Sequence, residues 1–433
     1  MTRPMRRKAV LAPLAASAGA LALVLTGCGG GGGSTTASSF TYLINSENTM
    51  IPGQITALSE NQCKAENTAL PLKVETVPQT NLDQKLQLLA GQNSLPVMYA
   101  AGNAPDLTKT LDGSGNVVDF EQALTDLDAL DDIEPAAIST IKALYGGKFN
   151  VLPYQYNIEG IWYNKQIFAD AGVEIPQTWD ELVTAADTIS KTGVTPFSAS
   201  GEQGWPLTRL VGDYLFRDLG ADALQKVADG DAKLTDPEYV EAAAAVADLG
   251  AKGYFGQGVG SIDYDTAAQQ FLTGKAAMFY MGSWILESMN DETANQIGID
   301  NVGFMPFPAV EGGKGSIDEY PANVGLPTTM NAKLYDDKVG DWLGCIAENY
   351  GSSALQDQGT ISGFKTNTEV TGVAPLTQEI QTTISESTSS VLWFEALFST
   401  KATTTSQTNA AQLVTGAISP EEFMQLVQAD LDN

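Results

Sequence analysis

The stretch IWYNKQIFADAGVEIPQTWDEL, residues 161–182, changes its hydrophobic pattern from that of a strand to that of a helix. Its first three residues are apolar and favour a strand, which leads into Asn164 and Lys165. Further on, Thr178 precedes Trp179 and is a residue type that caps helix N-termini, so we predict a helix over 179–190. The stretch therefore indicates that helices follow strands in this part of the chain.

The N-terminal part alternates in the same way. Strands are predicted at 40–44, 72–77 and 95–100, with helices at 53–66 and 81–91 between them. This β-α-β-α-β order is typical of a doubly wound α/β sheet, in which ligands bind beyond the carboxyl ends of the strands. The polar turns at 45–48 and 102–104 follow the first and third strands, so they are candidate binding segments.

Further elements follow along the chain. Strands are predicted at 148–153, 276–280 and 302–306, and helices at 207–219, 237–253, 264–274, 336–349 and 420–431. A folded part of roughly 390 residues exceeds one usual hydrophobic core, which favours two lobes.

The N-terminus has the pattern of an export signal. Four basic residues among the first eight precede the apolar run 9–25, and Leu25-Thr26-Gly27-Cys28 resembles the lipobox of bacterial lipoproteins. We expect 1–27 to be a signal peptide, Cys28 to carry lipid, and 28–39 to be a flexible Gly/Ser tether. The alternative is an ordinary signal peptide with a chance cysteine.

The composition excludes several classes of function. The chain has 23 Lys and Arg against 52 Asp and Glu, a net charge of −29, so we expect no nucleic-acid binding. It has no histidine, which removes the commonest general base, the Ser–His–Asp and Cys–His arrangements and most zinc sites. The segment 112–116 has only part of a calcium-loop pattern and is interpreted as a surface turn. Cys63 and Cys345 could form a disulfide or remain two buried thiols.

Two segments carry a family resemblance. Leu152-Pro153 with 161–182, and FLTGKAAMFYMGSW at 271–284, resemble signatures of the family 1 extracellular solute-binding proteins of ABC importers. One departure is Leu95-Pro-Val, where the family usually has an acid after the proline. The resemblance implies an α/β, two-lobe, type II periplasmic-binding-protein-like fold with a hinge and an interlobe cleft. It places lobe 1 at 40–154 plus 326–365 and lobe 2 at 155–325 plus 366–433.

The resemblance also implies a function. We expect a lipid-anchored monomer on the extracytoplasmic face of the membrane, without cofactor, metal or catalysis. It would capture a sugar or oligosaccharide and deliver it to the transmembrane subunits of an ABC permease. Two alternatives are a secreted glycoside hydrolase, which needs two suitably spaced carboxylates, and a binding protein for another solute such as a polyol phosphate or a peptide.

A sugar site needs aromatic planes for the apolar face and planar polar groups for the hydroxyls. The candidate substrate-binding residues are Asn45, Glu47, Asn103, Tyr156, Asn157, Trp205, Trp284, Trp393 and Phe394. Trp284 follows a predicted strand and two small residues that would let a ligand approach, although a core role is the alternative. Tyr156 could simply pack at the hinge, Glu47 could be a solvated acid, and Phe394 could belong to the core. Trp162, Trp179 and Trp342 are interpreted as structural.

Overall fold

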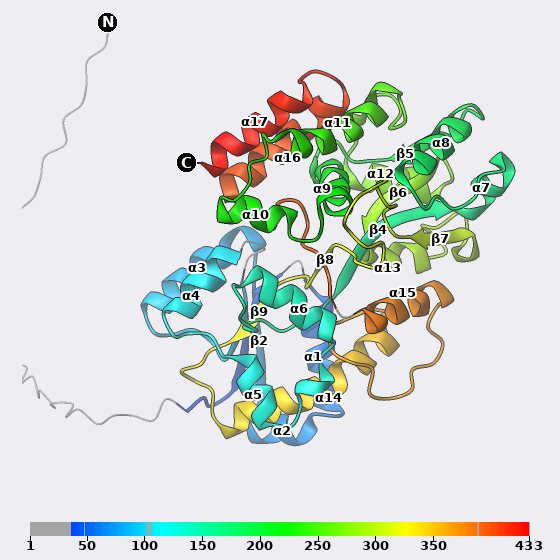
Figure 1. Ribbon diagram of the computed structural model, residues 1–433. Coiled ribbons are helices and arrows are strands. Elements are labelled where there is room, and N and C mark those ends of the chain that lie inside the picture. The colour runs from blue at the N-terminus through cyan, green and yellow to red at the C-terminus, as the bar shows by residue number, and fades with distance from the viewer. Residues whose placement is uncertain (1–35, 47, 102–104, 388, 433) are drawn as a thin grey trace, which may run out of the picture. The chain divides into compact units, whose positions relative to one another are not determined.

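The computed structural model describes residues 36–46, 48–101, 105–387 and 389–432 (Figure 1). The expected signal peptide, Cys28 and most of the tether therefore lie outside the described residues. Within the described part, two β-sheets form the centres of two lobes, which we call the first and the second lobe. No helix in the described ranges is long and apolar enough to cross a membrane.

The first lobe is built on a four-stranded sheet in the order β2-β1-β3-β9. Strand β1 (Phe40–Asn45) pairs in parallel with β2 (Leu72–Val77) and β3 (Met98–Ala100), and β9 (Thr328–Met330) pairs antiparallel with β3. The helices that precede β4 or follow β9 around this sheet are α1 (Met50–Glu60), α2 (Lys64–Ala69), α3 (Gln79–Gly91), α4 (Pro105–Gly113), α5 (Phe120–Asp126), η1 (Leu130–Asp132), α6 (Pro135–Leu144), α14 (Asp337–Gln358) and α15 (Pro375–Glu386). The predicted β-α-β-α-β order of the N-terminal part is confirmed, with the first helix divided into α1 and α2.

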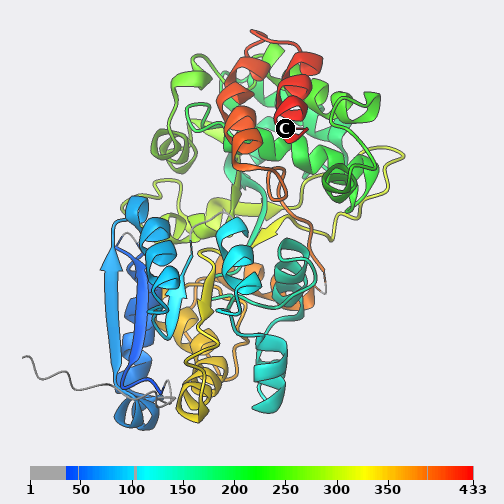
Figure 2. The same ribbon diagram turned by 90° about the vertical axis from the view of Figure 1, so that its left-hand side faces the viewer.

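The second lobe has the sheet order β5-β6-β4-β7, and β8 pairs with β4. Its strands are β4 (Asn157–Asn164), β5 (Thr195–Ser198), β6 (Ala276–Gly282), β7 (Val302–Met305) and β8 (Ala322–Asn323). Its helices are α7 (Lys165–Ala171), α8 (Trp179–Ser190), α9 (Trp205–Leu219), α10 (Ala223–Asp229), α11 (Pro237–Ala251), η2 (Val259–Ser261), α12 (Tyr264–Leu272), η3 (Ser283–Ile285), α13 (Leu286–Asn290), η4 (Ile299–Asn301), α16 (Thr400–Val414) and α17 (Pro420–Leu431). Figures 1 and 2 both show α9, α11, α16 and α17 gathered together on this lobe.

The helix at 179–190 forms as the sequence predicts. Thr178 accepts a hydrogen bond from the Glu181 backbone N–H at 3.3 Å, and Glu181 accepts one in return from the Thr178 N–H at 3.2 Å. These two bonds form a capping box that satisfies N–H groups at the start of α8. By contrast, the strand predicted at 148–153 is wrong, since only Leu152 forms a bridge there, to Thr328.

The chain passes between the sheets along three segments. Two of them are 153–156, between Leu152 and β4, and 324–327, between β8 and β9. Helix α15 packs against α6, where Ser385 donates a hydrogen bond to Glu134 at 3.1 Å. The Val391 N–H then bonds to the Tyr320 carbonyl at 3.0 Å, beside β8. Helix α15 therefore packs with the first lobe, and Val391 is the next described residue that bonds beside the strands of the second lobe.

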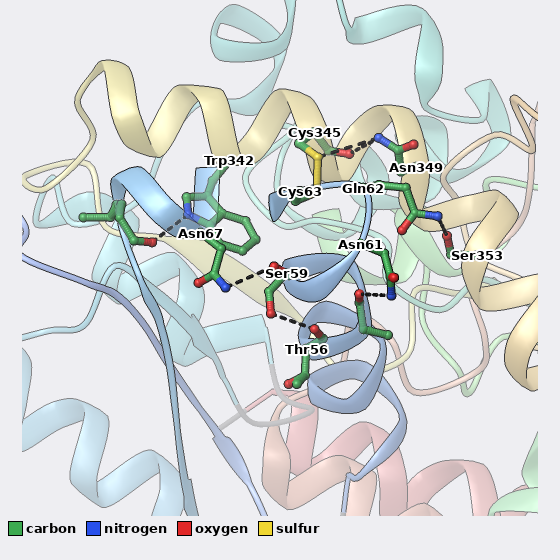
Figure 3. The surroundings of a disulfide bond; sticks show 12 residues. Thr56, Ser59, Asn61, Gln62, Cys63, Asn67, Trp342, Cys345, Asn349 and Ser353 are labelled. Carbon is green, nitrogen blue, oxygen red and sulfur yellow. Dashed lines mark hydrogen bonds between the residues drawn. A yellow bond between two sulfur atoms is a disulfide. The ribbon is translucent and has the colours of Figure 1, made fainter. Parts of the chain in front are cut away.

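A disulfide between Cys63 and Cys345 joins the start of α2 to α14 (Figure 3). The two Cα atoms lie 5.8 Å apart, within the usual range for a bridge. The bond settles the alternative that the sequence leaves open. In the described part of the chain, Cys63, Glu66 and Cys345 form the one cluster of possible metal ligands, and its two sulfur atoms are bonded to each other.

The three tryptophans interpreted as structural are buried. Trp342 donates its indole N–H to the Leu70 carbonyl at 2.9 Å (Figure 3), and Trp162 donates to Met281 at 2.9 Å. Trp179 packs against Phe307 at the start of α8, with 5.5 Å between ring centroids. These indoles satisfy their N–H groups or pack inside the lobes, which confirms the structural interpretation.

Candidate binding cleft

A cleft of about 940 Å³ lies at the passages between the two sheets. From the first lobe, the passages and the end of β8 it is lined by Asn45, Asn48, Thr49, Met50, Leu144, Tyr145, Gln155, Asn323, Val324, Gly325, Leu326 and Pro327. From the second lobe it is lined by Asn157, Trp205, Arg209, Trp284, Glu287, Trp393, Glu395, Ala396, Phe398, Thr400, Thr403 and Gln407. Asn45 ends β1, so the cleft lies beyond the carboxyl end of a parallel strand, as expected for such sheets.

Three tryptophans form one wall of the cleft. Trp205 starts α9, and its ring centroid lies 5.8 Å from that of Trp284 and 6.3 Å from that of Tyr264. Trp393 joins the same wall from the segment between α15 and α16. The sequence predicts all three tryptophans as candidate binding residues, and the structure brings them together around one cavity.

The position of Trp284 depends on a glycine two residues earlier. A Cβ atom at Gly282 would lie 2.0 Å from Cζ3 of the Trp284 ring, so the indole rests directly on the backbone of β6. The expectation that Gly282 leaves room for a ligand is therefore corrected. The room is occupied by Trp284 itself, whose ring fills the space that a side chain at Gly282 would take.

The cationic group of the cleft is Arg209, on α9, whose side chain is 13% exposed. Its Nη1 donates a hydrogen bond to Glu159 of β4, and its Nε lies 3.6 Å from Oε2 of Glu395. Burial alone would lower the pKa of Arg209, but the two carboxylates raise it above its ordinary value. Burial raises the pKa of Glu395 above its ordinary value, and this rise is only partly offset by Arg209 and by a hydrogen bond from Thr208. The guanidinium is thus already matched by two buried acids.

A chain of side-chain amides continues from this ion pair toward Trp284. Asn323 donates to Glu159 at 3.4 Å, and Asn157 donates to Asn323 at 3.3 Å. Ser283, the neighbour of Trp284, donates to Asn157 at 3.3 Å. Asn157 and Asn323 therefore lie along the cleft in fixed orientations, with further hydrogen-bonding capacity for hydroxyl groups.

On the first lobe, Asn45 has an unmet hydrogen-bonding group. Its side chain is 7% exposed and lines the cleft, and its Oδ1 is buried without a hydrogen-bond partner among the described residues. A buried acceptor without a donor is costly, and donation by a bound hydroxyl group would remove that cost. Nearby, Asn48 accepts the Ile51 N–H at 3.1 Å and so fixes the start of α1.

Two candidate residues lie away from the cleft. Tyr156 is 1% exposed and shares a hydrogen bond with Thr140 at 3.0 Å, so it packs at the passage between the sheets. Phe394 is fully buried against Gly212 and Phe398. Both assignments are corrected, because neither side chain lines the cleft, whereas the sequence neighbours Asn157 and Trp393 do. Glu47 and Asn103 lie outside the described residues.

Sequence reasoning missed Arg209 of the cleft and the two charged residues that follow it on the same face of α9. Arg209, Asp213 and Arg217 recur every four residues along α9, a helix that is otherwise largely buried. That spacing puts three ionisable groups on one helical face and is a signal for a buried polar network. Burial raises the pKa of Asp213 to about 8, although Arg217 opposes the rise. Asn323 and Gln155 were missed because nothing in their local sequence marks them.

Comparisons with known proteins identify the family. The bacterial extracellular solute-binding protein family matches residues 52–344, well over half of the chain. The chain belongs to this family. Its members bind solutes and do not convert them, so the glycoside hydrolase alternative is not supported.

Curated relatives align over part of their length. The multiple sugar-binding protein of Streptococcus mutans is 25% identical over 197 residues, which cover 42% of this chain and 44% of the relative. The xylose/arabinose-binding protein XacG of Haloferax volcanii is 26% identical over 205 residues, which cover 46% of this chain and 43% of the relative. The chain thus spans less than half of the length of these relatives in the alignments.

Solved structures extend the likeness to nearly the whole chain. A chitin oligosaccharide binding protein is similar with a TM-score of 0.74 and 26% identity, over 92% of this chain and 98% of that protein. This likeness and the two sheets agree with the two-lobe α/β fold that the sequence predicts.

Proposed function

We propose that this extracellular solute-binding protein captures a neutral oligosaccharide for an ABC importer. The observation that carries the proposal is that Trp205, Trp284 and Trp393 line one cleft together with side-chain amides. Indole rings suit the apolar C–H face of a pyranose, and the amides of Asn45, Asn157 and Asn323 suit its hydroxyl groups.

The charge of the cleft supports an uncharged ligand. Arg209 is the one cationic side chain among the described lining residues, and it is matched by Glu159 and Glu395. A phosphate or carboxylate ligand would need an unmatched arginine or lysine, so a polyol phosphate fits poorly. The sugar-binding relatives and the chitin oligosaccharide binding protein support the same ligand class.

The size of the cleft supports more than one sugar ring. Ligand sites usually have about 300–1,000 Å³, and a cleft of about 940 Å³ lies at the upper end of that range. A cleft of that volume has room for a short oligosaccharide, whose successive rings could contact the tryptophans and the amides that line it.

We also propose how the lobes move and how the protein stays at the membrane. The passages at 153–156, 324–327 and between Glu386 and Val391 would be the hinge, about which the lobes close on the sugar. Cys28 would carry the lipid, and residues 29–39 would tether the folded part near its permease. A Cys28→Ser variant would then be released from membranes into the medium, and retention of this variant would contradict the anchor.

A screen of neutral sugars tests the binding proposal. Purified protein is melted alone and with xylose, raffinose, maltotriose, xylotriose or triacetylchitotriose, and each mixture is analysed by chromatography afterwards. We expect one of the oligosaccharides to raise the melting temperature by several degrees and to remain intact. Stabilisation by none of the five sugars, or breakdown of the bound sugar, would overturn the proposal.

A further inference from the structure

The guanidinium of Arg209 lies between two tryptophan rings of the cleft wall. Its Cζ atom is 5.2 Å from the Trp205 ring centroid and 5.3 Å from that of Trp393. These distances are within the range of cation–π contacts, which strengthen when the cation is shielded from water. Arg209 therefore contacts both rings, although they come from separate parts of the sequence.

The two rings have different supports. Trp205 starts α9 and contacts Trp284 and Tyr264, so it is fixed within the second lobe. Trp393 belongs to the segment that enters the second lobe after α15. Arg209 links this entering segment to the rest of the wall, and its carboxylate partner Glu395 lies two residues beyond Trp393.

The guanidinium has two carboxylate partners, since Glu159 accepts a hydrogen bond from it and Glu395 lies within ion-pair distance at 3.6 Å. Glu159 comes from the buried strand β4 and also accepts a hydrogen bond from Tyr280 at 3.1 Å. Glu395 accepts hydrogen bonds from Thr208 of α9 and, at 3.3 Å, from Ser406 of α16. Both carboxylate side chains are at most 1% exposed. Arg209 is thus fixed by groups that are themselves fixed.

We propose that Arg209 is a positioning residue that holds Trp205 and Trp393 at the spacing a sugar requires. Glu159 and Glu395 neutralise the positive charge of Arg209, so that the cleft does not attract acidic sugars. This inference rests on the proposed function and adds to it the residue that orders the wall and excludes anions. A planar guanidinium fits between two indoles, whereas a lysine ammonium offers no plane to stack.

The first test needs no sugar. Acrylamide quenching of tryptophan fluorescence is compared for wild type, Arg209→Met, Arg209→Lys and the matched control Arg217→Met, each shown to be folded by circular dichroism. Arg217 is a buried arginine on the same helix, two turns away, and bonds to the Phe307 carbonyl at 2.9 Å. We expect increased quenching in Arg209→Met, a smaller increase in Arg209→Lys, and none in Arg217→Met. Equal quenching in Arg209→Met and wild type would overturn the positioning role.

The second test measures affinity for xylotriose and triacetylchitotriose by calorimetry. Arg209→Met should bind the better of these two sugars about tenfold or more weakly, with partial recovery in Arg209→Lys and at most a small change in Arg217→Met. An affinity of Arg209→Met equal to that of Arg217→Met would overturn the inference. If neither sugar binds the wild type, the affinities are compared with the screened oligosaccharide that does bind. If none of the screened oligosaccharides binds, the proposed function fails, and the quenching test still decides the positioning role.

The third test concerns charge. Trigalacturonic acid is titrated into wild type, Glu395→Gln and, as a second variant in case the first is unstable, Glu159→Gln. Each glutamine keeps the side-chain shape but leaves Arg209 with one carboxylate fewer. We expect the acidic trisaccharide to bind the variants about tenfold more tightly than wild type. Equal binding to wild type and to a folded variant would contradict the neutralising role.

Discussion

The indole of Trp284 rests on Gly282, so closely that an added Cβ would lie 2.0 Å from ring atom Cζ3. Because Gly282, the last residue of β6, has no side chain, Trp284 can lie beside the cleft. The contact is internal to the protein. Its effect on ligand binding can therefore be tested by replacing Gly282, while the side chain of Trp284 stays chemically unchanged.

Replacing Gly282 by alanine should displace the Trp284 ring, because no ordinary contact is as short as 2.0 Å. We expect Gly282→Ala to weaken oligosaccharide binding about tenfold or more and to destabilise the fold by about 1–3 kcal/mol. Calorimetry and thermal melting measure the two effects. Gly344→Ala is the matched control, since a Cβ there has no neighbour within 4 Å and alanine favours the helix. Unchanged binding by Gly282→Ala would show that the ring does not need its present position.

The disulfide should contribute strongly to stability, because it joins residues 282 positions apart in the chain. We expect the double variant Cys63→Ala/Cys345→Ala to lose about 2–5 kcal/mol of unfolding free energy. Urea denaturation with and without reducing agent measures this loss. Sugar affinity should stay unchanged, since neither cysteine lines the cleft. Equal stability of the oxidised and reduced wild type would contradict the prediction.

Asp213 should make stability fall as the pH rises. Burial raises its pKa in the folded protein to about 8 from an ordinary value of 3.8, despite the neighbouring Arg217 and Arg209. The folded state therefore holds a proton that the unfolded state has already released, and stability declines between about pH 4 and pH 8. Asp213→Asn is neutral at every pH, so it should be more stable than wild type at pH 8 by about 1–4 kcal/mol.

The measurement for Asp213 is urea unfolding of both proteins at pH 5 and pH 8. The difference in unfolding free energy between Asp213→Asn and wild type should be clearly larger at pH 8. At that pH, wild type has lost more of the stability that the bound proton on Asp213 gives at low pH. Tyr280 also lies near this group, but its pKa is raised well above its ordinary value, so it does not titrate between pH 5 and pH 8. An equal difference at the two pH values would mean that Asp213 does not hold the proton.

The sequence predicts the elements with strong local signals. The alternation around β1, β2 and β3 and the cap at Thr178 need only neighbouring residues, and the structure confirms them. Trp205, Trp284 and Trp393 could be named as site candidates because aromatic residues beside glycine or loop segments stand out. The residues that orient them could not, since Glu159, Arg209 and Glu395 meet only through tertiary packing.

Other errors also have a tertiary origin. Tyr156 and Trp393 are both aromatic residues near a passage between the lobes, yet one is buried with Thr140 and the other lines the cleft. Sequence alone does not say which side of such a segment faces the cavity. The same holds for the disulfide, because the distance between the Cys63 and Cys345 Cα atoms depends on how α14 packs against α1 and α2.

The central claim is that a sugar stacks on the tryptophan wall. Its most direct test is calorimetric titration of wild type and Trp284→Ala with the oligosaccharide that stabilises wild type most among raffinose, maltotriose, xylotriose and triacetylchitotriose. Loss of the stacking ring should reduce the binding free energy by about 2–3 kcal/mol, which corresponds to a roughly 30- to 150-fold weaker affinity. Trp179→Phe changes a side chain that does not line the cleft, so this variant should bind as wild type does. Equal affinity of Trp284→Ala and wild type for that sugar would contradict the account.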